Sequence, residues 1–398
     1  MHNTLTIDQI DFSGKTVLMR VDFNVPLQDG AVSDDTRIRR ALPSIEKITS
    51  AGGRLVLMSH LGRPKGQRQE KFSLKPAAER LSELAGKTVP LAPDCVGEET
   101  EKMVAALQNG DILLLENLRF HAGETANDPE FSRALAAHGE IYVNDAFGAA
   151  HRAHASTVGV THYISTCAAG YLMAAELQAL GKLIGEAEKP YIAILGGAKI
   201  SDKIEVIRNL LPRVTHILIG GAMAYTLLRS KGVDVGSSLV EEEKLDVAAE
   251  ALKSAAEQGV SLLVPEDHII ADAVNADAGR ATEDANIPAG MLGLDIGPKT
   301  ISTYSKLIAQ ARTIFWNGPM GVFENPAFAK GSLEIARAVA GATDDGAFSV
   351  VGGGDSVSAL KKSGMTDRIS HVSTGGGASL EFMSGKELPG VAALQGKK

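Results

Sequence analysis

Residues 170–190 read GYLMAAELQALGKLIGEAEKP, and this stretch separates two series of predicted strands. Its leucine and isoleucine side chains recur at the spacing of one helix face, at Leu172, Leu177, Leu180 and Ile184. A charged turn and Pro190 end the predicted helix. On pattern alone, a core helix and an inter-domain helix are equally good interpretations. The position between two series of strands favours the inter-domain helix.

Short apolar runs recur on both sides of this helix, and each run ends in polar or glycine-rich sequence. They are rich in β-branched residues or leucine and rarely alternate with polar residues, which is typical of strands buried on both faces of a parallel sheet. The runs are Thr16–Phe23, Arg54–Ser59, Asp111–Glu116, Ile141–Val143, Tyr191–Leu195, His216–Ile219, Ser261–Val264, Thr313–Trp316 and Phe348–Val351. Helix-like stretches lie between them, so the sequence predicts an α/β fold with right-handed crossovers. The predicted strands would form either one large sheet or two smaller ones.

The composition is that of an ordinary globular protein. The 398 residues allow two or three domains, and 44% hydrophobic with 22% charged residues exclude a disordered or fibrous chain. The net charge of −8 argues against a general nucleic-acid binder, and no run reaches the roughly 18 apolar residues of a membrane span. The first residues contain no apolar signal region, so we expect a cytoplasmic protein. Cys95 and Cys167 are expected to be buried free thiols.

Charged side chains follow the predicted strands of the first half, where a parallel sheet binds its ligands. The stretches are VDFNVP (21–26), DDTRIRR (34–40), SHLGRPKG (59–66), ENLRF (116–120) and NDAFGAAHRAHAS (144–156). Arginine at several equivalent strand ends favours a small anionic ligand over solvated surface charge. His151 and His154 have a spacing that would suit metal ligands, but the intervening Arg152 argues against a cation site.

Glycines follow the predicted strands of the second half. The stretches are LGGAKISDKI (195–204), IGGAMAYTLL (219–228), WNGPMGVFE (316–324), VGGGDSVSAL (351–360) and HVSTGGGASLEF (371–382). Glycine lets backbone N–H groups approach a phosphate, and a helix N-terminus favours its charge, so we expect a nucleotide here. Lys199 and Lys203 would either neutralise phosphate charge or be solvated. Asp355 would either hold the Mg²⁺ of ATP or ADP or serve as a helix N-cap.

The set of stretches, in this order along the chain, resembles the phosphoglycerate kinase family, and GLDIGP (293–298) belongs to the same set. P-loop, dinucleotide-fingerprint and protein-kinase motifs are absent. One departure is Ser356, where many members carry threonine; the hydroxyl is kept. The resemblance implies two Rossmann-like domains, each a mainly parallel β-sheet flanked by helices, joined by an inter-domain helix.

The resemblance also implies how the chain is divided. Residues 1–170 would bind 3-phosphoglycerate, with residues 385–398 packing back on them. Residues 171–188 would form the inter-domain helix and hinge, and residues 189–384 would bind the nucleotide. The implied activity is reversible, Mg²⁺-dependent phosphoryl transfer between ATP and the carboxylate of 3-phosphoglycerate, giving 1,3-bisphosphoglycerate and ADP in glycolysis or gluconeogenesis. The family is usually monomeric.

The resemblance assigns roles residue by residue. The residues implied for 3-phosphoglycerate are Asp22, Asn24, Arg37, His60, Arg63, Arg119 and Arg152. Those implied for the nucleotide are Lys199, Lys203, Gly220, Gly221, Gly293, Leu294, Asn317, Pro319, Glu324, Gly353, Gly354, Asp355 and Ser356. Arg37, Lys203 and Gly376 are expected to be catalytic, and Asp355 is expected to bind the metal.

These residue types suit the chemistry. A carboxylate acceptor is already ionised at neutral pH, so the reaction requires alignment and charge neutralisation rather than a general base. Because the anion-binding and nucleotide-binding residues lie in different halves, direct in-line transfer requires the halves to approach each other. Two other functions remain open: another ATP-dependent kinase or ligase acting on a small carboxylate, and a non-catalytic nucleotide-binding protein. Intact Arg37, Lys203 and Asp355 argue against the second.

Overall fold

The computed structural model describes residues 4–396, which divide into two compact units. Unit 1 comprises the described residues of Met1–Gln178 and Glu387–Lys398, and unit 2 comprises Ala179–Lys386. The predicted helix between the two strand series is α6, Tyr171–Gly185, and the boundary between the units falls inside it, after Gln178.

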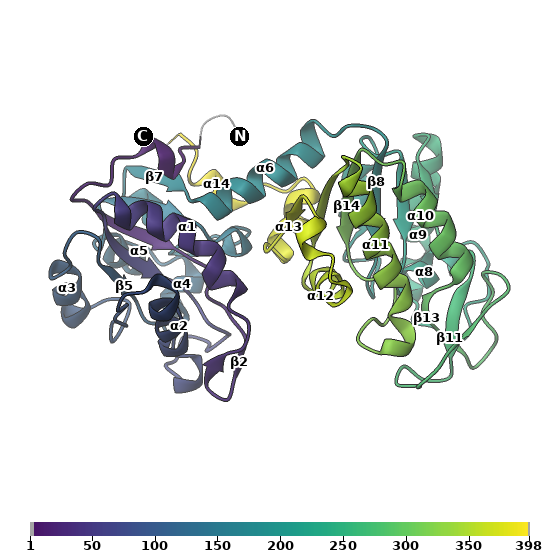
Figure 1. Ribbon diagram of the computed structural model, residues 1–398, viewed down its shortest axis with the longest axis horizontal. Coiled ribbons are helices and arrows are strands. Elements are labelled where there is room, and N and C mark those ends of the chain that lie inside the picture. Colours follow the sequence, from purple (N-terminus) through teal and green to yellow (C-terminus); the bar gives the residue numbers. More distant parts are fainter. Residues whose placement is uncertain (1–3, 397–398) are drawn as a thin grey trace. The chain divides into compact units, whose positions relative to one another are not determined.

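Unit 1 is built on a sheet of five parallel strands in the order β5-β4-β1-β6-β7 (Figure 1). The strands are β1 Thr16–Arg20, β4 Arg54–Met58, β5 Ile112–Leu114, β6 Ile141–Asn144 and β7 Thr166–Ala169. From β1 the chain moves outward through β4 to β5, and then returns to the other side of β1 for β6 and β7. Such a reversal of strand order leaves a crevice at the carboxyl ends of the two strands beside it, here β1 and β6.

The helices of unit 1 cover this sheet with apolar faces. In α1, Thr36–Ser50, the buried residues include Ile38, Ala41, Ile45 and Ile48. This spacing of three and four residues places them on one side, against alternate strand residues such as Met19. The other elements are η1 Ile7–Gln9, β2 Leu27–Gln28, β3 Ala31–Val32, η2 Glu70–Phe72, α2 Lys75–Ala85, α3 Glu98–Ala105, η3 Leu118–Phe120, α4 Ala122–Ala126, α5 Pro129–Ala136, η4 Phe147–Ala149, η5 Gly159–His162 and α14 Pro389–Ala392.

The C-terminal segment belongs to unit 1. The Gly390 N–H donates to the Ala150 carbonyl at 2.8 Å, and Thr4 and Gln395 form an isolated antiparallel bridge. Both ends of the described chain are therefore part of the same unit.

Unit 2 repeats the same topology with six parallel strands in the order β10-β9-β8-β14-β15-β16. These strands are β8 Tyr191–Leu195, β9 His216–Ile219, β10 Ser261–Leu263, β14 Thr313–Asn317, β15 Phe348–Gly352 and β16 His371–Val372. The strand order reverses between β8 and β14. A second, antiparallel sheet contains β11 His268–Ala271, β12 Arg280–Ala281 and β13 Leu292–Ile296.

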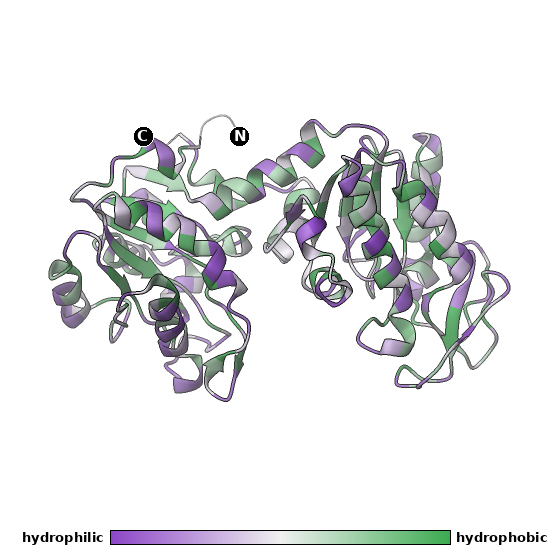
Figure 2. Cartoon of the chain, viewed as in Figure 1, coloured by the Kyte–Doolittle hydropathy of each residue, from purple (hydrophilic) through white to green (hydrophobic). Residues whose placement is uncertain are grey.

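The core of unit 2 lies between the parallel sheet and its helices. Every residue of β8 and β14 is buried, and Ile194 and Trp316 pack in one cluster with Tyr304 and Ile335. Figure 2 shows these strands as apolar, whereas the helices carry polar residues along part of their surface. The helices are α7 Ile204–Leu210, α8 Met223–Ser230, η6 Glu242–Lys244, α9 Leu245–Glu257, α10 Pro298–Ile308, η7 Pro326–Phe328, α11 Lys330–Asp344, α12 Gly354–Ser363, η8 Thr366–Arg368 and α13 Gly377–Met383.

All nine predicted strands are present, and they form two parallel sheets rather than one. The prediction missed β7, β16, the antiparallel pair β2–β3 and the three-stranded antiparallel sheet of unit 2. β7 reads TCAA and β13 reads LGLDI, so neither shows the run of bulky apolar residues on which the prediction relied. Within residues 4–396, no helix is both long enough and apolar enough to cross a membrane.

Candidate active site

Two backbone turns meet at the point where the strand order of unit 2 reverses. Leu195 and Asn317 are partners at the carboxyl ends of β8 and β14. Beyond them the Gly196 N–H donates to the Asn317 carbonyl at 3.0 Å, and the Gly197 N–H donates to the Pro319 carbonyl at 3.1 Å. A Cβ atom at Gly196 would collide with the carbonyl oxygens of Gly318 and Pro319. The turns can lie this close only because Gly196 has no side chain.

A pocket of about 350 Å³ opens at this edge of the sheet. It brings together the predicted residues Lys199, Lys203, Asn317, Pro319, Gly353, Gly354, Asp355, Ser356 and Gly376. Its floor is mostly glycine backbone, and α12 begins there at Gly354. Backbone N–H groups at a helix N-terminus bind phosphate well, so this pocket suits a polyphosphate.

Lys203 is the buried cation of this pocket, with 7% of its surface exposed. Its ammonium donates a hydrogen bond to Oδ1 of Asn317, and Nδ2 of Asn317 donates to the Gly352 carbonyl at 2.9 Å. Burial lowers the pKa of Lys203 to about 8, although Asp202 and Asp355 act in the opposite direction. The side chain is therefore charged at neutral pH and paired with a neutral amide, which leaves its charge available for an anion.

Asp355 lies in the first turn of α12 and is exposed. The N-cap of α12 is Gly353, so the interpretation of Asp355 as an N-cap is wrong. Among residues 4–396, no hydrogen-bond or ion-pair partner of its carboxylate is found. A free carboxylate beside lysines and helix N–H groups fits a divalent cation that arrives with phosphate.

The remaining predicted nucleotide residues lie outside the pocket lining, and most are bonded to its loops. The Gly221 N–H donates to the Met320 carbonyl at 2.8 Å. The carbonyl of Leu294, which follows Gly293 in β13, accepts from the Val322 N–H at 2.8 Å. Gly220 precedes Gly221 at the end of β9, and its α-carbon is packed against Met320. Glu324 is exposed at the end of the same loop.

The site assignments missed several residues of this pocket. Gly196, Gly197 and Gly318 build its floor, and the same strand-end glycine signal would have found them. Leu239, which lies outside the lining of this pocket, gave no sequence signal. It is 54% exposed, and it follows Ser238, whose Oγ accepts from the Gly293 N–H at 2.9 Å. It is thus an exposed apolar side chain beside β13.

In unit 1 the predicted polar residues gather at the carboxyl ends of the strands. Nη1 of Arg37, in the first turn of α1, lies 2.6 Å from Oδ2 of Asp22. Oδ1 of Asn24 accepts from the Gly62 N–H at 2.9 Å, and Nη1 of Arg119 donates to the Gly62 carbonyl at 2.8 Å. These bonds join the ends of β1, β4 and β5 into one polar surface.

This surface carries excess positive charge. Burial, together with Arg20 and Arg152, lowers the pKa of Arg119 to about 10, while Glu124 and Asp22 act in the opposite direction. A half-buried guanidinium whose pKa is depressed by other cations stabilises a bound anion. The cluster therefore suits a ligand with several negative charges.

His60 belongs to the same cluster. Its pKa lies well below the usual value because it is buried and because Arg20, Arg119, Arg37 and His154 surround it with positive charge. His60 is accordingly a neutral imidazole at physiological pH.

Two predicted arginines are exposed beside this cluster. Arg152 donates through Nε to Nε2 of His151 at 3.2 Å, and Arg63 follows Gly62 on the surface. In the described residues, neither His151 nor His154 belongs to a group of three potential metal ligands.

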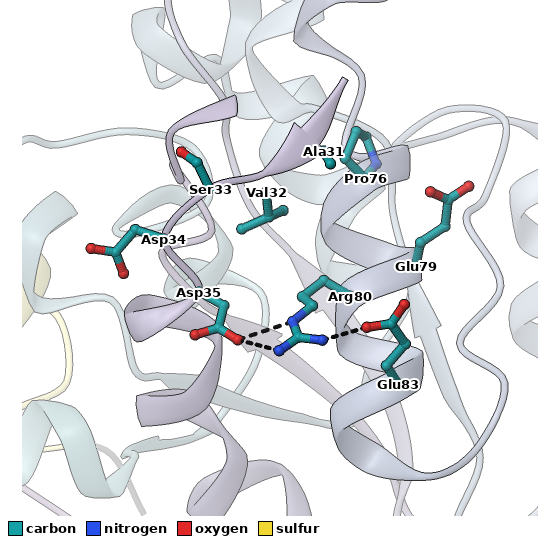
Figure 3. A pocket seen from close by; sticks show the side chains of 9 residues that line it. All are labelled: Ala31, Val32, Ser33, Asp34, Asp35, Pro76, Glu79, Arg80 and Glu83. Carbon is teal, nitrogen blue, oxygen red and sulfur yellow. Dashed lines mark hydrogen bonds and ion pairs between the residues drawn. The ribbon is translucent and has the colours of Figure 1, made fainter. Parts of the chain in front are cut away.

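Another pocket of unit 1, of about 530 Å³, contains none of the predicted residues (Figure 3). It lies between β3 and α2. Its central cation, Arg80, bonds to Asp35 at 2.7 Å and also to Glu83. Because its lining carries four carboxylates against the single guanidinium of Arg80, the pocket does not have the character of an anion site. The ion pair between Asp35 and Arg80 holds the start of α1 against α2.

Substitution of Gly221, which packs against the backbone of Gly197, tests how closely the turns approach. Gly221→Ala is expected to lower the free energy of unfolding of unit 2 by roughly 3 kcal/mol, because φ is +66° and the Cβ would lie 2.5 Å from the backbone N and O of Gly197. Gly259→Ala is the matched control, with φ of +70° and nothing within 4 Å, and should cost only about 1–2 kcal/mol. Denaturation followed by the fluorescence of Trp316, the single tryptophan, measures both. Equal losses would contradict the close approach.

Comparisons with known proteins agree with this geometry. The family model described as phosphoglycerate kinase matches residues 7–386. Phosphoglycerate kinases of Chlorobaculum tepidum and Chloroherpeton thalassium are 57% and 56% identical over 391 residues, covering 98% of each chain. The solved structure of phosphoglycerate kinase from Coxiella burnetii superposes with a TM-score of 0.89 at 42% identity, again over 98% of both chains. That from Pyrococcus horikoshii gives 0.85 at 33% identity. The chain therefore belongs to the phosphoglycerate kinase family.

Proposed function

We propose that the two units divide the substrates of the phosphoglycerate kinase reaction between them. The reaction is reversible transfer of a phosphoryl group between ATP and the carboxylate of 3-phosphoglycerate. Unit 2 would bind ATP or ADP, and unit 1 would bind 3-phosphoglycerate or 1,3-bisphosphoglycerate. The observation that carries this division is chemical. Unit 2 has a glycine-floored pocket with a buried lysine, whereas the strand ends of unit 1 carry clustered arginines around His60.

In unit 2 the phosphates would lie over the glycines of the 350 Å³ pocket. Lys199 is exposed at its edge and would bind phosphate as a mobile charge. Gly293, Leu294 and the exposed Leu239 would lie toward the base, since Leu239 places an exposed apolar side chain beside β13. Gly376, which precedes α13, would donate its N–H to the transferring group.

Asp355 would hold Mg²⁺, because its exposed carboxylate lies in the first turn of α12, beside the glycine backbone on which the phosphates would lie. When bound, Mg²⁺ neutralises phosphate charge while keeping most of its waters. Lys203 supplies the second positive charge, held by Asn317.

In unit 1, Arg37, Arg63, Arg119 and Arg152 would neutralise the phosphate and carboxylate of 3-phosphoglycerate. Asp22 would accept a hydrogen bond from the substrate hydroxyl. Asn24 is held in place by the Gly62 N–H and would orient the same part of the substrate. Because the acceptor carboxylate is already ionised, none of these groups needs to remove a proton.

Arg37 and Lys203 would flank the transferring phosphoryl group. Its negative charge is spread over three oxygens in the transition state, so two cations in fixed positions stabilise it more than they stabilise the ground state. Direct transfer brings the two substrates together, and we propose that the units approach each other about a hinge at α6. Closure also keeps water from the acyl phosphate. We expect the enzyme to act as a monomer in the cytoplasm.

The decisive assay is Mg²⁺-dependent formation of ADP from ATP in the presence of 3-phosphoglycerate. Lys203→Ala should lose about 3–4 kcal/mol of transition-state stabilisation, by analogy with removal of one oxyanion donor. The loss should appear in kcat. Lys199→Ala is the control and should mainly raise the KM for ATP, because Lys199 is exposed. A kcat of Lys203→Ala within threefold of the wild-type value would exclude the proposed role.

Lys203 also predicts a pH dependence. Its pKa is lowered to about 8, so its positive charge is present below pH 8 and is lost as the pH rises through 8. We expect kcat/KM for ATP to fall above about pH 8, by up to tenfold per pH unit. In Lys203→Arg the charge persists, and this basic limb should move beyond pH 10. The same limb in both enzymes would assign the titration to another group.

Closure is tested by small-angle X-ray scattering. The radius of gyration should decrease when 3-phosphoglycerate and a non-hydrolysable ATP analogue are both present, and should change less with either one alone. The same value in all four conditions would argue against closure.

A further inference from the structure

Three buried polar side chains form a continuous chain of hydrogen bonds inside unit 1. Arg20 is the last residue of β1, and Arg20, Ser156 and Glu124 are all 0% exposed. Nε of Arg20 donates to Oγ of Ser156 at 2.9 Å, and this hydroxyl donates to Oε1 of Glu124 at 2.6 Å. The Ser156 N–H donates to Oε2 at 3.0 Å. A guanidinium can only donate and a carboxylate can only accept, so the direction of each bond is determined.

Glu124 is the counter-charge of Arg20. Burial alone would raise the pKa of Glu124, but His154, whose Nδ1 lies 3.6 Å from Oε1, the charge of Arg20 and the hydrogen bond from the Ser156 hydroxyl lower it below its usual value. The carboxylate is therefore ionised. The attraction between two opposite charges bridged by one hydroxyl offsets much of the desolvation free energy of burying them. Burial of either charge alone would be strongly destabilising.

Arg20 also contacts the predicted substrate ligand His60. Nη2 of Arg20 lies 3.0 Å from Nδ1 of His60. The guanidinium has no lone pair, so Nδ1 must accept, and the proton of the neutral ring must lie on Nε2. Nε2 has no hydrogen-bond partner within residues 4–396. It is also absent from the fully buried polar atoms that lack a partner, so part of its surface is accessible. It is thus the accessible nitrogen of a ring that is 6% exposed.

The surroundings of His60 oppose a second proton on the ring. Arg20, Arg37, Arg119 and His154 face it from β1, α1, η3 and the segment after η4, and each disfavours the imidazolium. Protonation of Nδ1 would also break its bond to Arg20. Geometry and charge therefore act in the same direction.

We propose that Arg20 is a positioning residue that holds His60 as the neutral Nε2–H tautomer, with buried Glu124 keeping Arg20 in place through Ser156. His60 then presents a hydrogen-bond donor, rather than an acceptor or a titrating charge, to the anionic substrate. This proposal rests on the proposed function in one respect, that His60 contacts 3-phosphoglycerate. The alternative is a buried ion pair that stabilises unit 1 and has no effect on His60.

The tautomer is measured directly in the wild-type protein by long-range ¹H–¹⁵N NMR of the histidine side chains. His60→Gln serves only to assign the signals. We expect the proton on Nε2, with no change of charge state between pH 8 and pH 5.5. A proton on Nδ1, or an imidazolium present above pH 6, would overturn the proposal.

Arg20→Gln tests the positioning role, because an amide can either donate to Nδ1 or accept from it. In this variant the pKa of His60 should rise, because one of the cations that disfavour the imidazolium is removed. The ratio of its KM for 3-phosphoglycerate to that of the wild type should then vary by about fivefold or more between pH 5.5 and 7.5, because a cationic histidine binds an anion more tightly. The KM for ATP should be unchanged. Arg54→Gln is the matched control: Arg54 begins β4 and bonds to the Gly14 carbonyl, and its loss should alter neither the tautomer nor the KM ratio.

If Arg20→Gln does not fold, Arg20→Gln/Glu124→Gln removes both buried charges together and is measured in the same way. Unaltered His60 signals in whichever variant folds would overturn the positioning role. The proposed function is judged separately: addition of 3-phosphoglycerate should shift the Nε2 signal of wild-type His60. An unshifted signal from a ring shown to be Nε2–H would remove His60 from the substrate site and leave the tautomer assignment standing.

Discussion

The close approach of two backbone turns at the reversal of strand order is the constraint on which unit 2 depends. Parallel strands bring their carboxyl ends to one edge, and the reversal between β8 and β14 leaves their two loops side by side. The backbones of Gly196 and Gly318 are in contact there, and a Cβ atom on either residue would collide with the carbonyl oxygen of the other. The same approach places Asn317 where it can hold Lys203. Packing of the turns and placement of the buried Lys203 are therefore one requirement.

The two units solve the burial of charge in different ways. In unit 2, Lys203 is hydrogen-bonded to the neutral amide of Asn317, which leaves its positive charge uncompensated by that bond. In unit 1, Arg20 is compensated inside the protein by Glu124 through Ser156. A buried charge is tolerable only when it is hydrogen-bonded or paired. Unit 2 therefore satisfies its buried cation with a neutral hydrogen-bond acceptor, whereas unit 1 pairs its buried cation with a carboxylate and places it against His60.

Much of the fold was predictable because burial leaves a local signature. Strands covered on both faces must be apolar at every position, as in β8, and such runs are legible without any tertiary information. Among the strands that were not predicted, β7 consists mostly of small residues, and β13 includes Gly293 and Asp295. The N-cap interpretation of Asp355 failed for a related reason. The helix begins one residue before it, after a glycine with φ of +95°, and residue type alone does not define a helix start to within one position.

The sequence by itself determined the order of strands and helices, the strand ends that carry charge or glycine, and the family whose motifs these are. All of these are written in consecutive residues. Only the tertiary structure decided which charges are paired. Arg20 and Ser156 are 136 positions apart, and Lys203 and Asn317 are 114 apart. No local pattern distinguishes an arginine that binds substrate from one that is buried with a glutamate, because that difference depends on which strand ends the sheet brings together.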